Sequence, residues 1–214
     1  MAVSTEERRI VTVLFADMAG STALTEQLDP EEMRGLLQRY YTIARESVEQ
    51  HGGTVEKFIG DAVMAVFGLP SAHGDDPDRA VAAALTIRDR TQHDRQLNGI
   101  LALRFGVSTG EVVANRDHSR GDFLITGDAT NVAARLQQAA EPWSILVSDR
   151  TVRAASNFEF GDAIPISARG KSSPVRAHEV IGPKKPKART RISAPLVGRE
   201  TELAQLQHAS FFYG

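Results

Sequence analysis

The stretch IVTVLFADMAGST, residues 10–22, decides the fold. Its first part, Ile10 to Phe15, is apolar and rich in β-branched residues, which is typical of a strand buried on both faces. Asp17 follows at the end of this strand, and residues 20–22 begin a helical pattern. Because open α/β sheets bind their ligands where strands end and helices begin, we expect a functional site beside Asp17.

The rest of the chain alternates helical and strand-like segments. The first helical pattern runs through Leu28, and a second, amphipathic helix begins at Pro30 and ends near Gln50. The sequence TVEKFIGDAVMAVFG has two apolar runs on either side of Gly60-Asp61 and predicts a β-hairpin. Further helices are predicted at Asp78 to Leu97 and Asp128 to Ala140, and strands at Leu101 to Ser108, Glu111 to Ala114, Ile145 to Val147, Phe158 to Phe160 and Val175 to Ile181. This order predicts an α/β fold with a mixed sheet covered by helices.

Composition excludes several classes of protein. The chain has 214 residues, 42% hydrophobic and 24% charged, and no apolar run approaches the roughly 20 residues that a membrane span needs. The mixed acidic and basic residues at the N-terminus do not resemble a secretory signal, so none is expected. Because the chain has no cysteine, any metal must bind oxygen or imidazole. A net charge of -2 gives no basic footprint for nucleic acid. We therefore expect a cytoplasmic protein that neither crosses a membrane nor binds nucleic acid.

Two aspartates at strand ends are the first candidate site residues. Taken alone, Asp17 is typical of a helix N-cap and Asp61 of a Gly-Asp turn. Together they predict a site for divalent cations that assist phosphoryl displacement, and Mg²⁺ suits their hard oxygen ligands. Small side chains and backbone amides that suit a triphosphate follow Asp17, at Ala19, Gly20, Ser21 and Thr22.

Asn131 and Arg135 form a second candidate pair. They are four residues apart on a predicted helix, so both side chains point from one face. This spacing alone is also typical of a solvated polar stripe.

Three segments, FADMAGST, EKFIGDAVMAVFG and GDATNVAARLQ, resemble in order and spacing the catalytic domain of class III adenylate and guanylate cyclases. The resemblance covers about Arg9 to Ile181. It implies a ferredoxin-like mixed β-sheet core covered by helices, and a homodimer with two active sites shared between the chains. It also implies that ATP is converted to 3′,5′-cyclic AMP and pyrophosphate with two Mg²⁺ or Mn²⁺ ions at each site.

The resemblance also assigns roles to single residues. It places Asp17, Met18 and Asp61 at the metal site, Lys57 at the purine, Asn131 at the ribose and Arg135 at the transferring phosphorus. For the triphosphate it indicates residues 19–22 together with Arg169, with Lys171 as the alternative to Arg169.

Leu124 departs from the family pattern. It occupies the position where adenylate cyclases usually carry Asp or Thr, which partners Lys57 in reading the base. Leucine cannot accept a hydrogen bond from the adenine amino group. ATP is therefore expected first, with GTP or relaxed purine selectivity as the alternative. A third interpretation is a catalytically retired module that binds nucleotide.

The C-terminal part changes character. Residues 1–181 are the predicted cyclase domain, and residues 182–194 form a basic, proline-containing segment expected to be a linker. Residues 195–214 resemble the start of an ATPase domain that follows this cyclase type in many bacterial regulators. No P-loop motif is present in the chain, so a short helical tail is the alternative for this segment.

Overall fold

The computed structural model describes residues 6–116, 123–166 and 174–185. Its elements are, in chain order, β1 (Glu6–Met18), α1 (Ser21–Gln27), α2 (Pro30–Gln50), β2 (Thr54–Ile59), β3 (Ala62–Phe67), α3 (Asp76–His93), β4 (Leu103–Arg116), β5 (Phe123–Gly127), α4 (Asp128–Ala139), β6 (Ile145–Ser148), α5 (Asp149–Ala154), β7 (Phe158–Phe160), β8 (Ile164–Ile166) and β9 (Val175–Pro183). Among the described residues, no helix is both long and apolar enough to cross a membrane.

The sheet is mixed and has a ferredoxin-like centre. Its strands follow the order β2-β3-β1-β4-β6-β9-β7, with β5 paired to β4 and β8 paired to β9. Strands β2, β3, β1 and β4 are antiparallel neighbours, whereas β4 and β6 run parallel. Helix α2 connects β1 to β2 and α3 connects β3 to β4, which is the split β-α-β-β-α-β arrangement. This confirms the predicted fold class.

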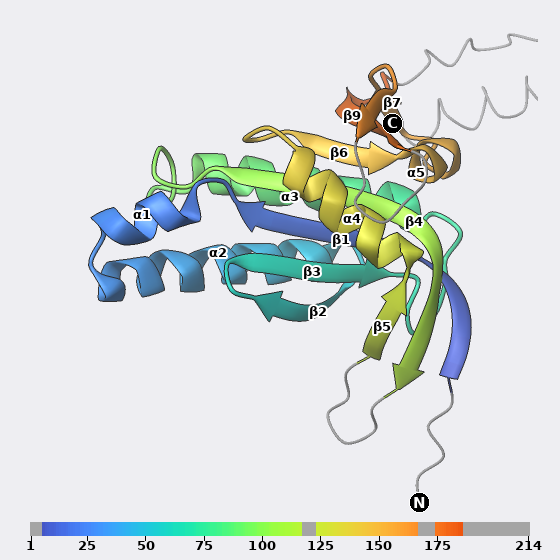
Figure 1. Ribbon diagram of the computed structural model, residues 1–214, viewed down its shortest axis with the longest axis horizontal. Coiled ribbons are helices and arrows are strands. Elements are labelled where there is room, and N and C mark those ends of the chain that lie inside the picture. The colour runs from blue at the N-terminus through green and yellow to red at the C-terminus, as the bar shows by residue number, and fades with distance from the viewer. Residues whose placement is uncertain (1–5, 117–122, 167–173, 186–214) are drawn as a thin grey trace, which may run out of the picture. The chain divides into compact units, whose positions relative to one another are not determined.

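Helices cover both faces of the sheet, and Figure 1 shows α4 in front of the strands and α3 behind them. Alternate residues of β1 point to opposite faces. Leu14 and Ala16 join the core beneath α2 and α3, whereas Val13 and Phe15 join the core beneath α4. The apolar run that opened the sequence analysis is therefore buried on both faces, as predicted.

The helix and hairpin boundaries follow local sequence signals. Asp29 caps α2, because its carboxylate accepts a hydrogen bond from the Glu31 amide at 2.9 Å and Pro30 occupies the first turn. Strands β2 and β3 form the predicted hairpin with Gly60 and Asp61 at its tip, and Gly60 has a φ of 60. This left-handed conformation favours glycine in the turn.

Several predicted elements differ from those of the structure. The two strands expected on either side of Thr109 and Gly110 are one strand, β4, because β1 pairs with it without interruption from Glu6 to Met18. Helix α3 starts two residues earlier than expected, at Asp76, and ends at His93, four residues short of the predicted end. Helix α5 and strand β8 were not predicted.

The last strand also extends beyond its predicted end at Ile181. Strand β9 continues to Pro183. Lys184 then donates its backbone amide to the Asn157 carbonyl at 2.8 Å and its Nζ to the Ser156 carbonyl at 2.7 Å. The described residues through Lys184 belong to one compact unit. The expected ATPase segment and most of the expected linker lie outside the described residues.

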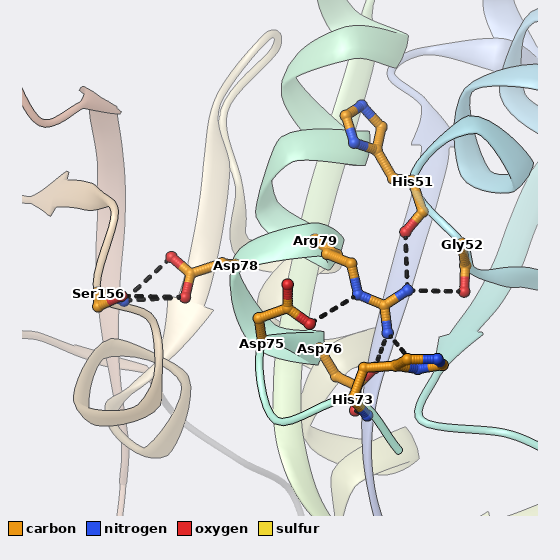
Figure 2. A network of polar contacts seen from close by, with 8 residues as sticks. All are labelled: His51, Gly52, His73, Asp75, Asp76, Asp78, Arg79 and Ser156. Atoms are coloured by element: carbon orange, nitrogen blue, oxygen red, sulfur yellow. Dashed lines mark hydrogen bonds and ion pairs between the residues drawn. The ribbon is translucent and has the colours of Figure 1, made fainter. Parts of the chain in front are cut away.

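A polar network at the start of α3 holds the elements that carry the hairpin (Figure 2). Arg79 donates to the backbone carbonyls of His51 and Gly52, both at 3.1 Å, and forms ion pairs with Asp75 and Asp76. These contacts fix the first turn of α3 against the connection between α2 and β2. The base of the hairpin is therefore tied to the helical layer.

On the other side of the same helical turn, Asp78 supports the connection between α5 and β7. Substitution of Asp78 should therefore destabilise the folded protein. Its buried carboxylate accepts from the amides of Ser156 at 3.0 Å and Asn157 at 2.7 Å. Asp78→Ala leaves these donors without their charged acceptor, so we expect the free energy of unfolding to fall by about 3 kcal/mol. Urea denaturation measures this change.

Asp75→Ala is the matched control for Asp78→Ala. Asp75 lies three residues away, and its side chain is 60% exposed in its ion pair with Arg79. An exposed pair contributes about 1 kcal/mol or less. Equal, small effects of both substitutions would contradict the structural role of Asp78.

Candidate active site

Asp17 lies near the end of β1, directly opposite Arg104 of β4. Its Oδ2 atom accepts two hydrogen bonds, one from Arg104 Nη2 at 3.1 Å and one from Gln137 Nε2 of α4 at 2.7 Å. The side chain is only 17% exposed. The carboxylate is therefore held between two strands of the sheet and the helix above them.

Asp61 lies at the hairpin tip, close enough to Asp17 to influence its protonation. Burial raises the pKa of Asp17 above its ordinary value, the negative charge and hydrogen bonding of Asp61 raise it further, and Arg104 opposes both effects. The Oδ2 atom of Asp61 is buried and has no hydrogen-bond partner. Two adjacent, partly buried carboxylates of this kind fit a divalent cation, because the cation relieves their repulsion and bonds the unpaired oxygen.

Within the part of the chain that the structure describes, the two aspartates are the carboxylates identified at this position. No cluster of three or more His, Asp or Glu side chains with metal-binding geometry occurs within the described ranges. The side chain of Met18 is buried in the core, so only its backbone could contribute to a metal site. Oxygen atoms of a bound ligand, such as a triphosphate, would have to complete the coordination.

Two consecutive tyrosines of α2 fix the backbone next to each aspartate. Tyr40 is fully buried, and its hydroxyl donates to the carbonyl of Ala16, the residue before Asp17, at 3.1 Å. The hydroxyl of Tyr41 donates to the carbonyl of Gly60, the residue before Asp61. One helix therefore holds both carboxylate-bearing segments. Burial raises the pKa of Tyr40 well above its ordinary value, with further contributions led by Asp17, so this hydroxyl remains a donor.

Lys57 reaches the α4 face of the sheet because of a β-bulge in β2. Val55 pairs with Ala65 and Lys57 pairs with Met64, which leaves Glu56 as the extra residue. Val55 and Phe58 pack against the core beneath α2 and α3, whereas Met64, opposite Lys57, belongs to the core beneath α4. The Lys57 ammonium forms an ion pair with the nearly buried Glu56 carboxylate at 3.0 Å.

Helix α4 presents different residues on opposite sides. Gln137 faces the sheet and contacts Asp17. At 3.6 residues per turn, Asn131 and Arg135 lie about 40° apart around the helix, whereas Gln137 lies about 120° from Asn131 and about 160° from Arg135. Asn131 is exposed and Arg135 is partly buried. The two predicted catalytic residues are therefore brought together, but on the side of α4 that points away from Asp17 of the same chain.

The segment after β1 starts α1 with an unusual backbone conformation. Gly20 has a φ of 73, a left-handed value that favours glycine. The Ala19 amide donates to the Ala102 carbonyl at 2.8 Å, so this predicted phosphate donor already has a partner. The amides of Ser21 and Thr22 belong to the first turn of α1, where a helix cannot satisfy them internally.

Three predicted site residues lie wholly or partly outside the part of the chain that the structure describes. Arg169 and Lys171 fall in residues 167–173, which the structure does not describe. The backbone of Leu124 in β5 pairs with that of Asn115 in β4. The side chain of Leu124 lies outside the part of the chain that the structure describes. Their predicted roles stay predictions.

The structure adds two residues that sequence reasoning missed, Arg104 and Gln137. Both donate to Asp17, and each carried a recognisable signal. Arg104 is a charged residue inside an apolar strand, and Gln137 continues the buried positions Ala129 and Ala133 at a four-residue spacing. A polar residue in a buried stripe needs a partner.

The sequence matches the family model for the adenylate and guanylate cyclase catalytic domain over residues 3–182. Among curated proteins, the uncharacterized protein Rv1320c of Mycobacterium tuberculosis is 36% identical over 179 residues, which are 79% of this chain and 31% of that protein. The uncharacterized protein Rv1318c of the same organism is 34% identical over 188 residues, which are 85% of this chain and 34% of that protein. The chain thus spans about a third of the length of the curated relatives it matches.

Two solved structures resemble the chain closely. The guanylyl cyclase Cya2 has a TM-score of 0.78 and 28% identity, and the match covers 85% of this chain and 96% of that one. The adenylyl cyclase CyaB from P. aeruginosa has a TM-score of 0.78 and 32% identity, and the match covers 85% of this chain and 98% of that one. One protein is named for each of the two purine nucleotides.

Proposed function

The chain belongs to the adenylate and guanylate cyclase catalytic domain family, and from this we propose that it converts ATP into 3′,5′-cyclic AMP and pyrophosphate. In this reaction the ribose 3′-oxygen loses its proton and bonds to the α-phosphorus, while the bond from that phosphorus to the pyrophosphate oxygen breaks. The observation that carries the proposal is the pair Asp17 and Asp61, adjacent and partly buried, with one carboxylate oxygen unpaired.

The two aspartates would hold Mg²⁺ or Mn²⁺, two ions per site. Bound there, the cations lower the pKa of the 3′-hydroxyl and neutralise charge on the leaving pyrophosphate. Arg104, beside Asp17, adds a positive charge for the triphosphate. The amides at the start of α1 supply neutral donors for the same group, and Arg169 or Lys171 is proposed as a further cation.

The remaining groups act on the base, the ribose and the phosphorus. Lys57 would donate to the purine and Asn131 would orient the ribose. Arg135 would stabilise negative charge that grows at the α-phosphate during bond formation, a role typically worth about 3 kcal/mol in the barrier. Residues that act only in the transition state favour an enzyme over a retired binding module.

A homodimer with shared sites is part of the proposal. Asn131 and Arg135 lie on the side of α4 opposite Gln137, which contacts Asp17. A single chain would therefore leave its aspartates without the ribose contact of Asn131 and the α-phosphate contact of Arg135. A second copy that places its α4 against the aspartates of the first would complete each site, and two-fold symmetry would then produce two equivalent sites.

Two other parts of the proposal rest on sequence alone. Residues 195–214 are proposed to begin an ATPase domain, and the protein is proposed to act in the cytoplasm, where ATP and Mg²⁺ are available.

The second candidate substrate is GTP, and Leu124 is the observation that favours it. Lys57 can donate to the adenine ring nitrogen and equally to the guanine carbonyl, so it discriminates weakly by itself. We expect kcat/KM for ATP to exceed that for GTP by only about 10-fold, equivalent to roughly 1.4 kcal/mol. Cyclase assays with Mn²⁺ and each nucleotide, followed by chromatography of the cyclic products, measure the ratio.

Variants at position 124 test the reason for this weak selectivity. Leu124→Asp should raise the ATP preference, because the carboxylate accepts from the adenine amino group while it remains charged. Leu124→Val is the matched apolar control and should leave the ratio unchanged. A wild-type protein that rejects GTP by more than about a thousandfold would show that another residue reads the base. Nucleotide binding without any cyclic product would support the retired module instead.

A further inference from the structure

Gln137 makes a contact that packing alone does not require. Its side chain is almost completely buried, at 4% exposure, and its Nε2 donates to Asp17 Oδ2 at 2.7 Å. Burying an amide is costly unless its donors are bonded. A short hydrogen bond to a carboxylate is stronger than one between neutral groups, so this contact orders both side chains.

The backbone beneath Gln137 is also fixed. Helix α4 passes very close to β4 at Gly106. A Cβ atom added to Gly106 would lie 2.1 Å from the backbone oxygen of Ala133 and 2.4 Å from the backbone nitrogen of Gln137. Gly106 pairs with Phe15, two residues before Asp17 on β1. Gln137 is therefore set at a defined distance from the strand that carries the aspartate.

The two donors to Asp17 differ in what they do to its charge. Arg104 and Gln137 both bond the Oδ2 atom. Arg104 is positively charged and forms an ion pair with this carboxylate at 3.1 Å. Gln137 is neutral, so it can hold Oδ2 in place without competing with a cation for the carboxylate charge.

From these contacts we propose that Gln137 is a positioning residue for cation binding. It holds Oδ2 of Asp17 so that the other carboxylate oxygen is presented to the cation together with the buried, unpaired Oδ2 of Asp61. Without Gln137, Asp17 turns toward Arg104 alone. This inference rests on the proposed function, because it assumes that the two aspartates bind the catalytic cations.

Gln137→Met tests the proposal, because it keeps a side chain of similar length without a donor. We expect the dissociation constant for Mn²⁺, measured by electron paramagnetic resonance without nucleotide, to rise about 10-fold. The Mn²⁺ concentration for half-maximal cyclase activity should rise similarly, while kcat at saturating Mn²⁺ falls by less than about threefold. A merely structural role would lower the melting temperature and leave the Mn²⁺ affinity unchanged.

Gln50→Met is the control. Gln50 is an exposed glutamine at the end of α2, so its substitution should change neither Mn²⁺ affinity nor activity. Gln137→Leu repeats the test if the methionine variant does not fold.

The possible outcomes separate this inference from the proposed function. Wild-type protein that binds Mn²⁺, with Gln137→Met binding it equally well, overturns the positioning role and leaves the cyclase proposal standing. Wild-type protein that neither binds Mn²⁺ nor responds to it in activity overturns both. Weaker Mn²⁺ binding by Gln137→Met but not by Gln50→Met supports the inference.

Discussion

Asp61→Asn should abolish cyclase activity, by about a thousandfold or more, while leaving the fold at least as stable. The substitution removes one of the two carboxylates proposed to hold the cations. It also removes the negative charge that raises the pKa of Asp17, so repulsion within the cation-free protein decreases. Activity is measured as cyclic AMP formed at saturating Mn²⁺, and stability as the free energy of unfolding in urea.

The opposite directions of these two changes make the test specific. A residue that merely supports the fold would lose stability and activity together. Asp162→Asn removes an exposed aspartate between β7 and β8 and serves as the control, with neither quantity expected to change. Retained activity in Asp61→Asn would remove the basis of the proposed cation site.

Mixing two inactive variants should restore activity if the sites are shared. Arg135→Ala alone is expected to reduce turnover about a hundredfold, because it removes stabilisation of charge at the phosphorus. A dimer of one Asp61→Ala chain and one Arg135→Ala chain has both losses in one site and neither in the other. A 1:1 mixture with random pairing should therefore recover about a quarter of wild-type activity.

The control uses the same two substitutions in a single chain. When the double variant pairs with a wild-type chain, each site has one loss, so these heterodimers are inactive. Equal mixing should then lower the activity per wild-type chain about twofold. No recovery in a mixture shown to contain heterodimers would mean that Arg135 serves the aspartates of its own chain.

Local patterns in the sequence predicted much of the fold. The apolar run before Asp17 is a strand buried on both faces, and the hairpin turns at Gly60 and Asp61 as expected. Because β3 lies beside β1 in the sheet, the two predicted aspartates are brought together. The strand and the hairpin turn depend on residues that are close in the chain. The meeting of the two aspartates depends on the order of the strands, for which the sequence of elements allows few arrangements.

Contacts across the sheet were not predictable in this way. Arg104 meets Asp17 because of the register between β1 and β4, and Gln137 meets it because α4 packs tightly at Gly106. Both depend on positions more than 80 residues apart in the chain. The same limit applies to the continuous strand β4, since Thr109 and Gly110 resemble a turn until β1 is paired beside them.

The extra residue at Glu56 has a consequence for aligning and engineering related chains. Side chains of a regular strand alternate, so an alignment that ignores the extra residue exchanges the faces of the residues on one side of it relative to those on the other. Positions counted backward from the Gly60-Asp61 tip keep their assignment, whereas positions counted forward from Thr54 lose theirs beyond Val55. Such an alignment, made from Thr54, places the lysine on the wrong side of the sheet even when every residue type is retained.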